Sequence, residues 1–85
     1  MNSVSIIGFL REKIDNTYRY FEYEMPFDEE EIHLKRQIVV KYWEGQENSR
    51  LIVLPSNTRV AIQGRLDASD KFGTILIVEI FQVLR

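Results

Sequence analysis

The feature that most constrains this fold is a series of short runs in which apolar and polar residues alternate, each ended by turn residues. Alternation with a period of two is typical of a strand that buries one face. It predicts five strands, over residues 3–12, 17–25, 33–43, 59–67 and 74–84. No segment has the spacing of a long amphipathic helix. Residues 44–58 leave room for only a turn or two of helix before Pro55.

This order of elements predicts an all-β fold. A five-stranded barrel with a short helical or irregular insert between strands three and four is the plan of the oligonucleotide/oligosaccharide-binding (OB) fold. Gly8 lies in the middle of the first strand, where a bend would let that strand serve both halves of the barrel. An SH3-like barrel is the alternative, but we expect it to have a tighter final turn and no such insert. We expect one domain, over residues 1–85.

The last strand is apolar on both faces. A chain of 85 residues without cysteine builds a small core that no disulfide can reinforce. Because a small barrel buries one face of each strand, we expect a subunit interface to cover the second face, in a homodimer or homotetramer. The two faces predicted by alternation are Ile75, Ile77, Phe81 and Val83 on one side, and Leu76, Val78, Ile80 and Leu84 on the other.

The residue types give no basis for catalysis. His33 is the single histidine, no cysteine or clear serine nucleophile accompanies it, and the four glycines are scattered. The acidic segment over 27–32 lacks the offsets and the glycine turn of a calcium loop. We therefore expect a non-enzymatic protein with no cofactor and no metal. Without a targeting signal or a membrane span, we expect a cytoplasmic protein.

The net charge of −2 conceals an uneven distribution. Six of the 13 acidic residues lie between Glu22 and Glu31, with no basic residue among them. The rest of the chain carries 11 basic residues against seven acidic ones, a balance of +4. This distribution permits a weakly basic groove, although it does not by itself indicate one.

Three segments carry a family resemblance. The start, MNSVSIIGFL, has an Asn before an alternating strand with Gly-x-Leu; RQIVVKYW follows at 36–43, and V-x-I-x-G-x-L begins at Val60. In this order and spacing they resemble the bacterial single-stranded DNA-binding protein family over nearly the whole chain. The resemblance is closest in the first ten and about the last thirty residues. It implies an OB fold and sequence-tolerant, non-catalytic binding of single-stranded DNA, in the bacterial cytosol and nucleoid.

The chain departs from that family in three ways. The family has a flexible tail with an acidic, Pro-Phe end that recruits replication proteins, whereas this sequence ends at Arg85, so we expect that role to be lacking. The insert is shorter, and the family's stacking aromatics do not align cleanly. We expect a minimal or divergent member, or a relative in which the fold serves as a protein adaptor.

Candidate binding residues come from the outward faces of the strands and from the hairpin tip over 68–73. Single strands are held by cations along the phosphates and by aromatic rings on which bases stack. For the aromatic residues, ordinary packing is the competing interpretation, and for Phe72 it is a ring folded back onto the barrel or into a subunit contact. The candidates are Tyr18, Tyr20, Lys35, Lys41, Trp43, Arg65, Lys71 and Phe72.

Two functions compete. The first is a sequence-tolerant single-stranded DNA-binding protein of replication, repair or recombination, with possible replication proteins as partners. The second is an OB-fold adaptor, an accessory subunit of a primase, polymerase or primosome, with little DNA binding. The negative net charge and the incomplete aromatic set favour the second, whereas the terminal motifs favour the first.

Overall fold

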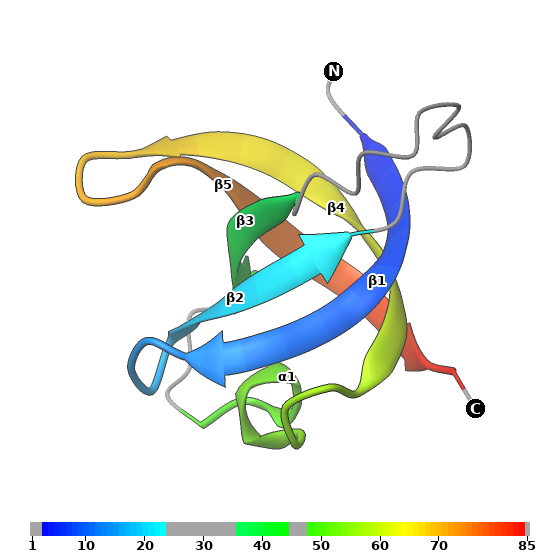
Figure 1. Ribbon diagram of the computed structural model, residues 1–85. Helices are drawn as coiled ribbons and strands as arrows, with labels where there is room; N and C mark the ends of the chain where they lie inside the picture. Colours follow the sequence, from blue (N-terminus) through cyan, green and yellow to red (C-terminus); the bar gives the residue numbers. More distant parts are fainter. Residues whose placement is uncertain (1–2, 24–35, 45–47, 85) are drawn as a thin grey trace.

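The predicted strands close into a barrel in the order β1-β2-β3-β5-β4 (Figure 1). The computed structural model describes residues 3–23, 36–44 and 48–84. Within them, β3 and β5 pair in parallel and all other neighbours are antiparallel. This arrangement, with one short helix between β3 and β4, confirms the predicted OB fold. The elements are β1 (Val4–Lys13), β2 (Tyr18–Tyr23), β3 (Gln37–Tyr42), α1 (Arg50–Val53), β4 (Arg59–Ser69) and β5 (Gly73–Val83).

The first strand curves around the barrel, as Gly8 predicted (Figure 1). Gly8 pairs with Val60 of β4 on one side and with Tyr23 of β2 on the other. A Cβ at this position would lie 2.2 Å from the carbonyl oxygen of Glu22. Only glycine allows the backbone of β2 to approach β1 this closely, so the bend depends on this residue.

The barrel interior is filled by the apolar face of each strand. Phe21 in β2 and Val40 in β3 point inward, and both are fully buried. Leu51 of α1 joins the same cluster from the end of the barrel near the helix (Figure 1). The buried members of this main core are Leu10, Phe21, Val40, Leu51, Val60, Ile62, Leu76 and Val78.

A β-bulge in β5 corrects the predicted faces of that strand. Gln63 pairs with Ile80 and Gly64 with Val78, so Glu79 is an extra residue without a partner in β4. The extra residue reverses the side on which later side chains lie. Phe81 therefore packs against the main core, whereas Ile75 and Ile77 belong to a separate cluster. The prediction that Phe81 shares a face of β5 with Ile75 and Ile77 is therefore wrong.

That separate cluster covers the second apolar face of β5 from within the chain. Ile75 and Ile77 are buried together with Val39 of β3. Three partly buried side chains pack against this cluster: Ile14, Tyr18 and Phe72. The expectation that a subunit interface must cover this stretch is therefore wrong. What stays outside is the end of β5 beyond the bulge, where Ile80 is 62% exposed.

A buried arginine ties α1 to the barrel. Arg19 follows Tyr18 in β2 on the inward side, and its side chain is fully buried. Its Nη1 donates to the carbonyl oxygens of Leu51 and Ile52, each at 3.0 Å, and of Leu54 at 2.8 Å. Nε and Nη2 donate to the carbonyl of Arg11, at 3.1 and 2.6 Å. Desolvation in this position lowers the pKa of Arg19.

Candidate nucleic-acid-binding surface

Two aromatic rings meet between the start of β2 and the turn that joins β4 to β5. Tyr18 begins β2, and Phe72 lies in the turn between β4 and β5. Their ring centroids are 5.0 Å apart and the planes are tilted by 51°. Both residues are half-buried, because they cover Val39, Ile75 and Ile77 with one side. Phe72 is thus folded back onto the barrel, and the pair forms an aromatic platform with its other side in solvent.

Turn chemistry holds each ring in place. Asp15 accepts hydrogen bonds from the backbone N–H groups of Thr17 and Tyr18, both at 2.8 Å, and so closes the turn between β1 and β2. The hydrogen bond from Thr17 has the largest effect on the pKa of Asp15, and the bond from Tyr18 the next largest; both lower it. The positive charge of Lys71 lowers this pKa further. In the other turn, Ser69 Oγ accepts from the N–H of Phe72 at 3.2 Å.

Cations lie around the aromatic platform. Lys41 pairs with Tyr18 across the sheet, and its Nζ is 5.8 Å from the centre of that ring. The Nζ of Lys71 is 5.2 Å from the centre of the Phe72 ring. Arg65 is exposed on β4 and pairs with Ile77, so its side chain leaves the sheet on the same outward face. Two predicted cations therefore lie beside the two rings, and Arg65 lies farther along the same outward face.

Tyr20 extends this face along β2. It pairs with Val39 and is 38% exposed. Because side chains of Tyr18 and Tyr20 leave the strand on the same side, a bound chain could pass from one ring to the next. Tyr20 is therefore a second position where an aromatic ring is accessible from the outward face.

The remaining two predicted residues are not part of this group. Trp43 is 52% exposed just beyond β3, and its ring lies 6.2 Å from that of Tyr42 rather than against the platform. Tyr42 in turn meets Phe81 edge-on at 6.1 Å. Lys35 lies outside the described residues. The structure therefore brings six of the eight candidates to one face.

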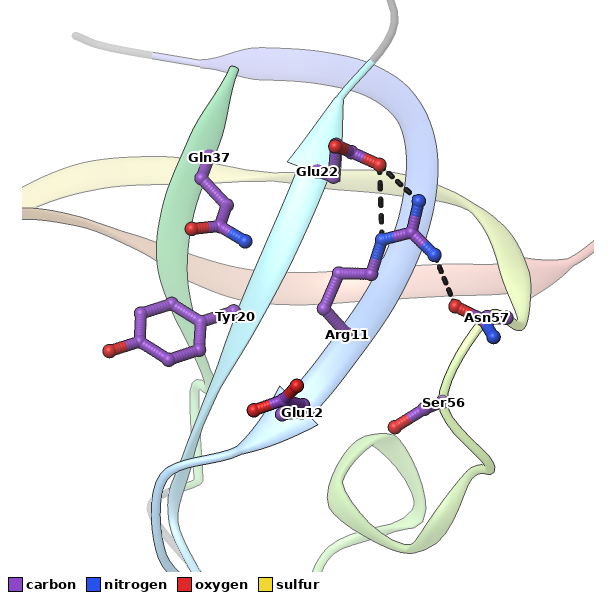
Figure 2. A pocket seen from close by; sticks show the side chains of 7 residues that line it. All are labelled: Arg11, Glu12, Tyr20, Glu22, Gln37, Ser56 and Asn57. Atoms are coloured by element: carbon purple, nitrogen blue, oxygen red, sulfur yellow. Dashed lines mark hydrogen bonds and ion pairs between the residues drawn. The ribbon is translucent and has the colours of Figure 1, made fainter. Parts of the chain in front are cut away.

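Beside Tyr20 lies a polar pocket that the sequence pattern did not indicate (Figure 2). Arg11 is its central group: Nε donates to Glu22 Oε2 at 3.0 Å, Nη2 donates to the same oxygen, and Nη1 donates to Asn57 Oδ1. The volume is about 710 Å³. We name it the side pocket; its lining residues are Arg11, Glu12, Tyr20, Glu22, Gln37, Ser56 and Asn57.

The fold and this surface define the chain as an OB-fold barrel with an aromatic and cationic outward face. Among solved structures, it is similar to the N-terminal domain of the PriB protein from Thermoanaerobacter tencongensis, a structure described as dimeric. The two share 20% of their residues, with a TM-score of 0.61, over 99% of this chain and 97% of that one. No protein-family model and no curated protein matches the sequence. At this identity, the likeness shows a common fold.

Across residues 3–23, 36–44 and 48–84, no group of three or more His, Cys, Asp or Glu side chains is arranged to hold a metal ion. No helix in those ranges is long and apolar enough to cross a membrane.

Proposed function

We propose that the protein is a non-catalytic, sequence-tolerant single-stranded DNA-binding protein of the bacterial cytosol, acting in replication, repair or recombination. The observation that carries the proposal is the aromatic platform of Tyr18 and Phe72, with Lys41 and Lys71 directly beside it. Bases stack on exposed rings while cations follow the phosphates, and this combination suits a strand of any sequence.

The magnitudes fit a binder of moderate affinity. Each base stacked on an aromatic ring contributes about 1–3 kcal/mol, so the platform and Tyr20 account for a few stacked bases. Lys41, Arg65 and Lys71 supply the positive charge, but Asp67 pairs with Ile75 on the same outward face and reduces it. Stacking then provides a large share of the affinity, with a limited electrostatic part.

The test is fluorescence anisotropy of a labelled oligo(dT) titrated with the protein at two salt concentrations. Three phosphate contacts predict a slope of log K against log salt of about −2. Lys41→Glu should weaken binding at both salt concentrations and reduce the slope, while the chain stays folded. Quenching of Trp43 emission would place the strand near the end of β3. If the protein does not bind oligo(dT) at low salt, the proposal is wrong.

A protein adaptor of the same fold, an accessory subunit of a primase, polymerase or primosome, is the second candidate. It is favoured by exposed groups away from the platform: Trp43 is 52% exposed, and Arg50 lies over the ring of Phe81 at 5.6 Å. Trp and Arg often dominate the energy of protein interfaces. An apolar protein interface would be nearly indifferent to salt, so the same titrations separate the two functions.

We also propose a homodimer, with a homotetramer as the alternative. The outward face of β1, β4 and β5 carries Ile7, which pairs with Ala61, and Ile80, which pairs with Gln63. Ile7 is 41% exposed and Ile80 is 62% exposed. The similar PriB domain is described as dimeric, which supports the same arrangement for a small barrel with this apolar face.

A further inference from the structure

We propose that the path of the bound strand ends at the side pocket, because Glu22 keeps Arg11 from contacting phosphate. The inference rests on the proposed function and adds a limit to the part of the outward face that the strand occupies. Its basis is that the chain itself engages the guanidinium of Arg11, beside Tyr20 on that face (Figure 2).

An irregularity in β1 places two charged residues next to Tyr20. The register between β1 and β2 shifts between Leu10 and Lys13, so Arg11 and Glu12 lie together opposite Tyr20. Both side chains line the side pocket, as Tyr20 does. A strand that leaves the aromatic platform along Tyr20 therefore meets these two charges next.

Every nitrogen atom of the Arg11 guanidinium has a partner within the chain. Nε and Nη2 donate to Glu22 Oε2, the first at 3.0 Å, and Nη1 donates to Asn57 Oδ1. Figure 2 shows these two partners on different sides of the guanidinium. The ring centre of Phe9 is 5.4 Å from its Cζ atom. Three of the five N–H groups thus have acceptors before a strand arrives, and the carboxylate of Glu22 neutralises the positive charge.

The charge of the whole pocket opposes phosphate. Glu12 and Glu22 carry two negative charges against the single positive charge of Arg11. The aromatic platform, by contrast, has Lys41 and Lys71 beside its rings. The negatively charged backbone of a strand is therefore attracted at the platform and repelled at the side pocket, so the path ends before the pocket.

Removal of the Glu22 charge should turn Arg11 into a phosphate contact. In Glu22→Gln, an amide oxygen still accepts a hydrogen bond from the guanidinium, so Arg11 stays in place. Its positive charge is then balanced only by Glu12, and the pocket no longer repels phosphate. The strand can therefore extend past Tyr20 and gain one contact.

The experiment follows the anisotropy of a labelled oligo(dT) of about 12 nucleotides, a length within the roughly 4–16 that one OB fold occupies, at several salt concentrations. For the wild type, three phosphate contacts give a slope of log K against log salt of about −2. Glu22→Gln should bind about tenfold more tightly at low salt, the gain from one charge-assisted hydrogen bond. Its slope should steepen to about −3.

Two variants without Arg11 show whether this residue is responsible. Arg11→Gln alone should leave the slope at about −2, since Arg11 contacts no phosphate in the wild type. Arg11→Gln combined with Glu22→Gln should lose the gain and return the slope to about −2. Asp67→Asn is the matched control: it removes the same charge from the same outward face, where Asp67 pairs with Ile75, and should leave the slope unchanged.

Three results would overturn the inference while the proposed function stands. The first is a slope for Glu22→Gln equal to that of the wild type. The second is a gain that survives the loss of Arg11, or that Asp67→Asn reproduces. The third is a slope that becomes shallower by about 0.7 in Arg11→Gln, which would mean that Arg11 already contacts phosphate; it decides the matter even if Glu22→Gln does not fold. If the wild type does not bind oligo(dT) at low salt, the proposed function fails and the inference fails with it.

Discussion

The guanidinium of Arg19 lies 2.8 Å from the carbonyl oxygen of Leu54, and this hydrogen bond joins β2 to the chain leaving α1. The same side chain reaches the carbonyls of Leu51 and Ile52. The last four carbonyl groups of a helix have no hydrogen-bond partner within the helix. Because α1 has only four residues, all of its carbonyl groups need partners from elsewhere. Within the buried end of the barrel, Arg19 satisfies two of these carbonyls, those of Leu51 and Ile52.

Arg19→Met should therefore destabilise the protein strongly. Methionine fills most of the volume but donates nothing, so several buried carbonyl groups lose their hydrogen bonds, each at a cost of about 1–3 kcal/mol. We expect the free energy of unfolding to fall by at least about 3 kcal/mol, measured by urea denaturation followed through Trp43 fluorescence.

Arg65→Met is the control for this variant. Arg65 is exposed on β4, so its replacement should change the free energy of unfolding by less than about 0.5 kcal/mol. Similar unfolding midpoints for the two variants would contradict the role given to Arg19.

Arg19 also illustrates what the sequence can reveal. Arg19 is two positions before Phe21 in β2, so their side chains leave the strand on the same, inward side. Alternation alone therefore places a charged residue in the barrel. Its partners in α1 could not be predicted in this way, because the carbonyls of Leu51 and Ile52 lie 32 and 33 positions later and are brought there by the fold. The order of the strands, the bend at Gly8 and the outward faces of β2 and β3 were predictable because they depend on local patterns.

The faces of β5 and the side pocket were not predictable from these patterns. The bulge at Glu79 is a property of the pairing between β4 and β5, and nothing in the alternation of residues 74–84 marks it. The pocket joins Arg11 of β1 to Asn57 of the α1–β4 connection, which are 46 positions apart. Such a juxtaposition follows from closure of the barrel rather than from any one segment.

Gly8→Ala should weaken the barrel at the bend of β1. The added Cβ would lie 2.2 Å from the carbonyl oxygen of Glu22 and 2.7 Å from the Cα of Tyr23, so the backbones of β1 and β2 must separate. We expect a loss of about 3 kcal/mol in urea denaturation. Gly73→Asn is the comparison: its φ is +74° and no atom lies within 4 Å of an added Cβ, so the loss should stay below about 1 kcal/mol. Equal losses would show that the close approach at Gly8 is not limiting.

Stability should depend on Asp15 in acid. Its folded pKa lies below the ordinary value of 3.8, because the carboxylate accepts two backbone hydrogen bonds. A depressed carboxyl pKa stabilises the fold above pH 3.8, and this contribution is lost as the pH falls through the folded pKa. Asp15→Asn keeps an acceptor for the turn but cannot titrate. Its Tm should lie below that of the wild type at about pH 6, and the difference should shrink as the pH falls below 3.8 and through the folded pKa. A constant difference would contradict this account.

Ile80→Asp should dissociate the proposed dimer. A charge on the outward face of β5 would be buried without a partner in the interface, whereas in a monomer it would be solvated. Light scattering at micromolar concentration should give twice the 10.1 kDa chain mass for the wild type and one chain mass for the variant. Val53→Asp, at a site on α1 that is 59% exposed, is the control and should leave the dimer intact. A monomeric wild type would rule out the interface.

The two rings of the aromatic platform should act as a unit in binding. Phe72→Ala removes one stacking surface and also the lateral support of Tyr18, whose ring centre is 5.0 Å away. Each single alanine variant should weaken oligo(dT) binding by about 1–3 kcal/mol. The double variant should lose less than the sum of the two single variants, with a coupling energy of at least about 0.5 kcal/mol, because either change already disrupts the surface that the other ring completes.

The matched control is the double-mutant cycle of Phe72→Ala and Trp43→Ala. Trp43 contacts Tyr42 rather than the platform, so the losses of these two single variants should add. Additive losses for Tyr18 and Phe72 would mean that the rings bind separate bases independently, and the strand path would then have to be redrawn as two sites.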